Sequence, residues 1–136
     1  MPFDIRPVQT KRDLETFLAF PWRIYQGDPI WVPPLLPERR KALDPARGTF
    51  FQRGGYAQCF LAWDGSTPTG TICAAEDTLT NAQRGLKDGM FGFFECVNDA
   101  GTARALLDTA AAWLRARGLQ TLCGPFNLDY EESYGG

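Results

Sequence analysis

Apolar residues along the chain follow two patterns, the alternation typical of strands and the 3.6-residue repeat typical of helices. Residues 3–8 alternate and predict a strand, and Thr10–Asp13 then supplies a helix-capping signal. The helix that follows is expected to end at Pro21, because proline lacks a backbone N–H donor. Three apolar residues share one face of this short amphipathic helix: Leu14, Phe17 and Leu18.

Prolines interrupt the next segment, residues 20–37, where they are interleaved with large apolar side chains. Proline blocks long regular structure while the apolar side chains favour burial, so we expect an ordered, packed loop. Pro37 suits the first turn of a second helix, which should run through Leu43.

A β-hairpin is predicted next, because two strand-like runs, 56–63 and 69–77, are joined by turn residues. After a polar stretch, residues 89–97 are apolar on both faces, as an internal strand would be. The glycines of this run indicate close packing or a bulge.

The strongest helical pattern begins at the capping residue Asp99 and ends at Gly118. Residues 119–124 then predict a strand, and a strand–helix–strand crossover is expected to be right-handed, with its two strands parallel. Residues 125–136 show no recognisable closing element. The helix that begins at Asp99 has one apolar stripe, formed by Ala103, Leu106, Leu107, Ala110 and Leu114. The order of elements therefore predicts an α/β domain.

Composition excludes several classes of function. The 136 residues fit one domain, and 44% hydrophobic residues with a net charge of -2 exclude extended disorder and broad nucleic-acid binding. Histidine is absent, which excludes imidazole chemistry. No leader or membrane-length apolar run is recognised, so we expect a cytoplasmic protein with no membrane partner. We expect no metal site, and reduced core positions for the four cysteines, Cys59, Cys73, Cys96 and Cys123.

The order of elements, with the segments FLAWDGSTPTGTI, FPWRIYQGDPIWVPPLL, FGFFEC and GPFN, resembles the GNAT (N-acetyltransferase) superfamily. It is similar to the N-terminal part of longer bacterial GNAT-like proteins. The resemblance implies a mixed central sheet flanked by helices in a single domain, residues 1–136, truncated after the fifth strand. That domain would lack the family's C-terminal helix and last two strands. Such a chain is either a fragment, or it completes its sheet as a homodimer through the exposed edge.

The resemblance also implies acetyl-CoA or another acyl-CoA as cosubstrate. The family's [QR]-x-x-G-x-[GA] pattern falls on residues 98–103, where Gly101 and Ala103 match and Asn98 departs. The pyrophosphate would meet Gly101, Thr102 and Ala103 at the helix start, and the pantetheine arm would lie along Cys96 and Val97. Asp99 would repel a diphosphate there, and the alternative is that it only caps the helix.

Glu95 is the candidate catalytic base, because many GNAT enzymes carry a carboxylate at the end of this strand. Burial among Phe93, Phe94 and Cys96 would favour its protonated form and suit it to accept the amine proton. Strand parity puts it on the face of Phe91 and Phe93. The alternative is a carboxylate that neighbouring donors satisfy, with no chemistry.

An acceptor pocket is expected to be lined by three aromatic residues, Trp22, Tyr25 and Trp31, because the matching GNAT region borders the acceptor. The alternative is that they cover the sheet as core residues. The implied function is transfer of an acetyl or acyl group to an unknown small-molecule or peptide amine. The alternative is an inactive GNAT-like fragment that acts in assembly or binding through its sheet edge.

Overall fold

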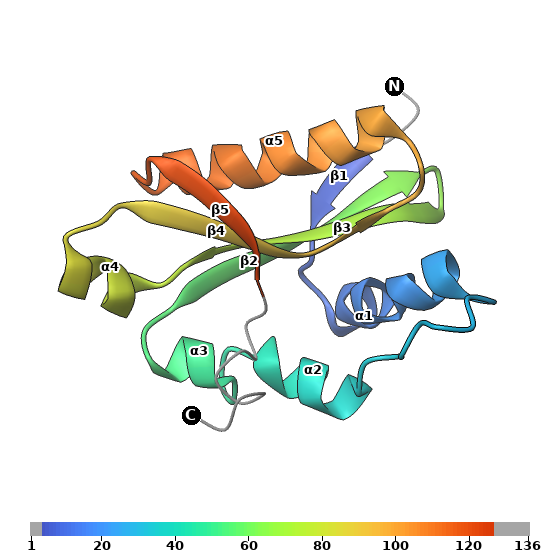
Figure 1. The fold of residues 1–136 in the computed structure, drawn as a ribbon, viewed down its shortest axis with the longest axis horizontal. Coiled ribbons are helices and arrows are strands. Elements are labelled where there is room, and N and C mark those ends of the chain that lie inside the picture. Colours follow the sequence, from blue (N-terminus) through green and yellow to red (C-terminus); the bar gives the residue numbers. More distant parts are fainter. Residues whose placement is uncertain (1–3, 127–136) are drawn as a thin grey trace.

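A five-stranded mixed sheet forms the centre of the computed structural model, which describes residues 4–126 (Figure 1). Neighbouring strands are antiparallel from the first to the fourth, and the fifth runs parallel to the fourth. The predicted hairpin and the parallel crossover are both confirmed. The strands lie in chain order: β1 (Asp4–Pro7), β2 (Tyr56–Asp64), β3 (Thr67–Glu76), β4 (Asp88–Cys96) and β5 (Thr121–Phe126).

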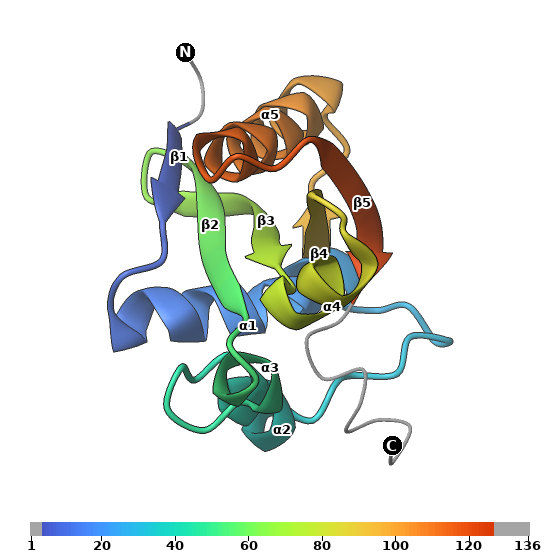
Figure 2. The ribbon, with the colours of Figure 1, turned by 90° about the vertical axis from the view of Figure 1, so that its left-hand side faces the viewer.

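Helices cover both faces of the sheet, as Figure 2 shows. The long helix α5 (Ala100–Ala116) packs on one face and buries Leu106, Ala110 and Leu114 against the strands. The opposite face is covered by α1 (Lys11–Tyr25), α2 (Leu36–Ala42) and α3 (Thr49–Gln52). The short helix α4 (Thr78–Arg84) connects β3 to β4.

Helix α1 begins where the sequence predicts and ends later than predicted. Thr10 and Asp13 form a reciprocal capping box. The prediction that Pro21 ends the helix is wrong, because α1 continues through it to Tyr25. The missing N–H costs one helical bond, and the buried proline ring together with the ring contacts made by Trp22 and Tyr25 offsets that loss.

Glycine allows α5 to approach the sheet closely. A Cβ atom on Gly70 would lie 2.6 Å from Leu106 Cδ1 and 3.0 Å from Cys96 Cβ. Leu106 is fully buried and packs in a cluster with Ile72 and Ala110. This contact fixes the height of α5 above β3.

Several features differ from the sequence expectations. Helices α3 and α4 lie in segments with no predicted helix; Asp77 caps α4 by accepting from the Thr80 amide. Cys123 is exposed on β5, an outer strand of the described sheet, whereas the other three free cysteines are buried or half-buried. The loop after α1 is only partly packed, because Ile30, Val32 and Leu35 are 86%, 83% and 64% exposed.

Candidate functional site

A β-bulge in β4 determines how the candidate site is built. Thr71 of β3 pairs with Glu95, and Cys73 pairs with Gly92, so β4 uses three steps where β3 uses two. Phe93, within this interval, has a φ of 51°, which is unusual for a residue other than glycine. Thr71 is buried and donates its hydroxyl to the Phe93 carbonyl at 2.7 Å. That bond satisfies a backbone acceptor that the bulge takes out of the ladder.

The bulge changes which side chains share a face of β4. Phe93 packs 6.0 Å from the Phe17 ring, on the α1 side. Phe91 and Phe94 join the cluster under α5 instead. The expectation that Glu95 shares a face with Phe91 is therefore wrong, because the extra residue reverses the alternation between them. Glu95 lies with Phe93, facing α1.

Glu95 accepts a hydrogen bond from Tyr25 in the last turn of α1. The Tyr25 hydroxyl lies 2.5 Å from Glu95 Oε2. Its bond to the carboxylate, with a further contribution from burial, raises the pKa of Tyr25 to about 12. Tyr25 therefore stays a protonated donor at neutral pH. Within residues 4–126, no group donates to the other carboxylate oxygen, Oε1, which is available to accept a proton.

A cavity of about 290 Å³ lies beside this pair, between α1 and the ends of β4 and β5. Arg39 of α2 reaches over it, with its guanidinium carbon 4.9 Å from the centre of the Phe93 ring. Among the described residues, the lining of the cavity is apolar on the α1 side and includes one carboxylate and one guanidinium. Its lining includes Phe17, Pro21, Arg39, Phe94, Glu95 and Pro125.

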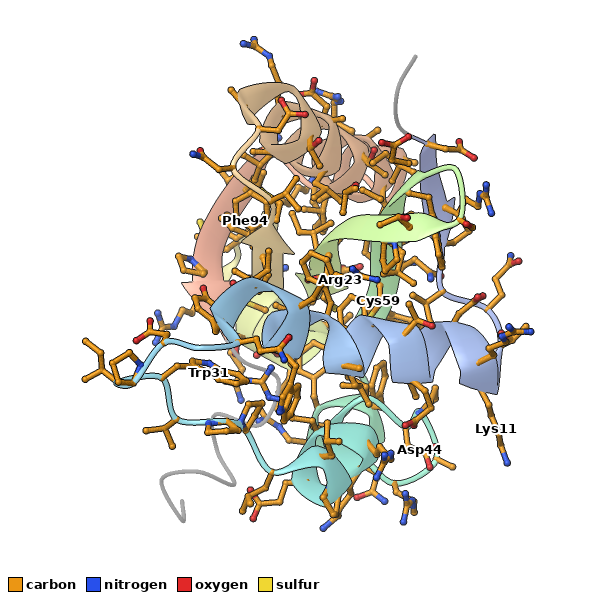
Figure 3. The ribbon with its side chains drawn as sticks, turned by 90° about the vertical axis from the view of Figure 1, so that its right-hand side faces the viewer. Lys11, Arg23, Trp31, Asp44, Cys59 and Phe94 are labelled. Carbon is orange, nitrogen blue, oxygen red and sulfur yellow. The ribbon has the colours of Figure 1, made fainter. Side chains whose placement is uncertain are left out.

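The three aromatic candidates form one cluster at the end of α1. Trp31 stacks on Tyr25 with 5.5 Å between ring centres and meets Trp22 edge-on at 5.2 Å. All three are half-buried, so they do not form part of either buried core cluster. Figure 3 shows Trp31 on the loop beside the end of α1. Tyr25 connects this cluster to Glu95.

The start of α5 borders a second, open hollow of about 690 Å³. Asp99 caps the helix, and its carboxylate accepts from the Gly101 amide and the Thr102 hydroxyl at 3.0 and 2.9 Å. Thr102 is buried, so its side chain faces the core. Arg23 of α1 lies across the hollow and supplies its positive charge. The lining includes Arg23, Cys96, Val97, Asn98, Asp99 and Ala103.

The structure therefore separates the sequence candidates into two groups. Glu95 and Tyr25 are bonded to each other, and Cys96, Val97, Asn98 and Ala103 share the hollow at α5. The Gly101 amide is already bonded to Asp99. Sequence reasoning did not find Arg23 or Thr71, because their roles depend on contacts between distant segments. No group of three or more potential metal ligands occurs within residues 4–126.

The cysteines give a pH-dependent test of this geometry. Burial, followed by the charges of Asp99 and Glu95, raises the pKa of Cys96. Alkylation requires the thiolate, so the rate for Cys96 should reach half its maximum at a higher pH than for an ordinary thiol. We expect Cys123 to react first, Cys96 later, and buried Cys59 and Cys73 only on unfolding, as followed by peptide mass spectrometry with iodoacetamide. Equal rates for Cys96 and Cys123 at pH 8 would contradict this placement.

No model of a known protein family matches the chain. Two curated proteins are similar in sequence. The bacterial ceramide synthase of Caulobacter vibrioides is 39% identical over 143 residues, which cover 99% of this chain and 37% of that protein. Protein YghO of Escherichia coli K12 is 33% identical, covering 96% of this chain and 33% of its own length. The chain thus spans about a third of the length of the curated relatives it matches.

Solved structures share its architecture. A GNAT-family acetyltransferase from Staphylococcus aureus Mu50 matches with a TM-score of 0.60 and 14% identity, over 98% of this chain and 79% of the other. The chain has the GNAT fold. A second GNAT-fold match is a predicted acetyltransferase of Clostridium acetobutylicum, solved with acetyl-CoA, with a TM-score of 0.62, 14% identity and 98% and 89% coverage. A third match is FeeM, an N-acyl amino acid synthase from uncultured soil microbes, with a TM-score of 0.61, 15% identity and 97% and 75% coverage. The expectation of a GNAT-like mixed sheet flanked by helices is confirmed.

Proposed function

We propose that this chain takes part in acyl transfer from an acyl-CoA to an amine, with Glu95 as general base. The observation that carries the proposal is the placement of Glu95 beyond the bulge, beside a cavity, with Oε1 open to accept a proton. The amine nitrogen attacks the thioester carbonyl carbon, the C–N bond forms and the C–S bond breaks. Glu95 takes the amine proton, which then passes to the departing thiolate or to solvent.

The acyl-CoA would enter through the hollow at the start of α5. Its size and Arg23 suit a diphosphate, whereas the Asp99 carboxylate opposes one. Because Gly101 already donates to Asp99, we place the phosphates nearer Arg23 and Ala103, with the pantetheine arm along Cys96 and Val97. The acetyl-CoA in the Clostridium acetobutylicum protein of the same fold supports an acyl-CoA cosubstrate.

The names of two matches support an amine acceptor. A ceramide is a long-chain amino alcohol acylated on nitrogen, and one relative is named a ceramide synthase. FeeM is named an N-acyl amino acid synthase. We therefore propose a long-chain primary amine as acceptor for this chain, with its amino group at Glu95 and its neighbouring atoms against the aromatic cluster.

A second candidate function is assembly through the sheet edge, without catalysis. It is favoured by one observation: the Gly101 amide, which would otherwise donate to a diphosphate, already donates to the Asp99 carboxylate. β5 is an outer strand of the described sheet and would supply the edge.

Coenzyme binding distinguishes the two. We expect acetyl-CoA or a long-chain acyl-CoA to stabilise the protein by about 2.7 kcal/mol at 100 times its dissociation constant, measured as a thermal shift. Arg23→Ala should weaken binding, while the control Arg104→Ala, an exposed residue on α5, should not. No shift at millimolar coenzyme would favour the assembly function.

A further inference from the structure

Three aliphatic side chains project into solvent from the loop between α1 and α2. Ile30, Val32 and Leu35, called here the apolar tip, are 86%, 83% and 64% exposed, more than any other large hydrophobic residue of the described chain. The loop stands away from the body of the protein in Figures 2 and 3. Sequence analysis expected these residues to be packed, and it expected no membrane partner because no membrane-length apolar run is recognised. Apolar side chains that enter only the lipid surface do not require such a run.

The loop is held in shape although its tip is exposed. Trp31 points inward onto Tyr25 and Trp22, between the outward-facing Ile30 and Val32. Asp28 accepts from the Ile30 amide at 2.9 Å. Three prolines in and beside the tip restrict its backbone further. Insertion of a preformed loop costs less conformational entropy than insertion of a flexible one.

The segment that carries the tip is basic in sequence, which fits an anionic surface. Residues 20–43 contain four Lys or Arg and two Asp or Glu, although the whole chain has a net charge of -2. Arg40 is paired with Glu15. Within residues 4–126, Arg23 before the loop and Lys41 after it form no ion pair. Basic side chains beside an inserted apolar segment are attracted to anionic lipid headgroups.

The area of the tip argues against a second copy of the chain as the occupant. Three side chains at this exposure present on the order of 400 Å², about half of the roughly 800 Å² per partner in a standard protein interface. Insertion into a lipid surface has no such requirement, because a few apolar side chains with nearby cations suffice for reversible binding.

We propose that the apolar tip inserts into the surface of an anionic lipid bilayer. A consequence, which rests on the proposed function, is that the site faces its acceptor in the membrane. Trp31 and Tyr25 lead from the inserted loop to Glu95, so an amphiphilic amine would present its amino group to the carboxylate while its tail stays in lipid. No helix of the described residues is long and apolar enough to cross a bilayer.

The test is flotation with vesicles of phosphatidylcholine containing phosphatidylglycerol. We expect the protein to float with them, and the triple variant Ile30→Ser, Val32→Ser, Leu35→Ser to bind at least about tenfold more weakly. The control is Leu79→Ser with Leu86→Ser, exposed leucines at 41% and 42% in and after α4, which should bind like the wild type. Salt should also weaken binding, because it screens the headgroup attraction.

Three results would overturn the proposal: no flotation of the wild type, equal flotation of the triple variant, or a dimer in light scattering that only the triple variant loses. Circular dichroism checks that the variants fold. If the triple variant does not fold, the test is repeated with the single change Val32→Glu. Flotation involves no acyl transfer, so its failure leaves the proposed chemistry standing, and an inactive protein that floats would leave the tip proposal standing.

Discussion

Replacing Glu95 by glutamine is expected to lower the rate of acyl transfer by about 100-fold or more, the usual contribution of a general base. The amide keeps the size of the side chain and still accepts the Tyr25 hydrogen bond, so the fold should not change. What is lost is the ability to take the amine proton. The measurement is release of free coenzyme A thiol in the presence of a long-chain primary amine.

Two variants accompany this test. Asp108→Asn removes the same charge from an exposed position on α5 and should leave the rate unchanged. Tyr25→Phe removes the donor to the carboxylate but keeps the ring on Trp31, and should reduce the rate by less than Glu95→Gln. A Glu95→Gln protein with a third of the wild-type rate would remove Glu95 from the base role.

Replacing Leu106 by alanine is expected to lower the free energy of unfolding by about 3 kcal/mol, within the range for a large buried residue. Leu106 of α5 is fully buried against β3. The packed helix and strands around it have little room to close the cavity that alanine would leave. For a chain of this length the change corresponds to a fall of about 10 °C in Tm. Urea unfolding followed by circular dichroism measures it.

Leu79→Ala is the matched control, and it should cost less than about 1 kcal/mol because Leu79 is 41% exposed. A double-mutant cycle then tests the contact itself. Gly70→Ala should destabilise the wild type, since its Cβ would lie 2.6 Å from Leu106 Cδ1. In the Leu106→Ala background the same change should cost less. Additive effects would show that the two residues do not constrain each other.

The sequence predicts most of the fold because its strongest signals are local. The hairpin of β2 and β3 follows from alternation and turn residues, and α5 from its cap and apolar stripe. The errors occur where tertiary contacts override a local rule. Pro21 does not end α1, because aromatic packing beyond it stabilises another turn. The exposed tip was missed because apolar character alone does not show whether a residue has anything to pack against.

The site is less predictable than the fold. Glu95 could be selected from its position at the end of an apolar strand, but its neighbours could not. The Tyr25 hydroxyl arrives from 70 residues away, and no sequence spacing encodes that contact. The bulge was anticipated only as a possibility of the glycine-rich strand, and its effect on strand parity depends on where the extra residue falls.

The extra residue in β4 changes the face of the sheet on which the following side chains of this strand lie. Phe91 and Phe94 pack under α5, whereas Phe93 and Glu95 lie on the α1 side, where they line the cavity. If β4 kept its length but paired with β3 without the bulge, Glu95 would share the face of Phe91 and turn toward the apolar layer beneath α5, where an unpaired charge is costly. Aligning distant homologues by residue type alone would therefore misassign the reactive position, whereas counting residues from the bulge would locate it.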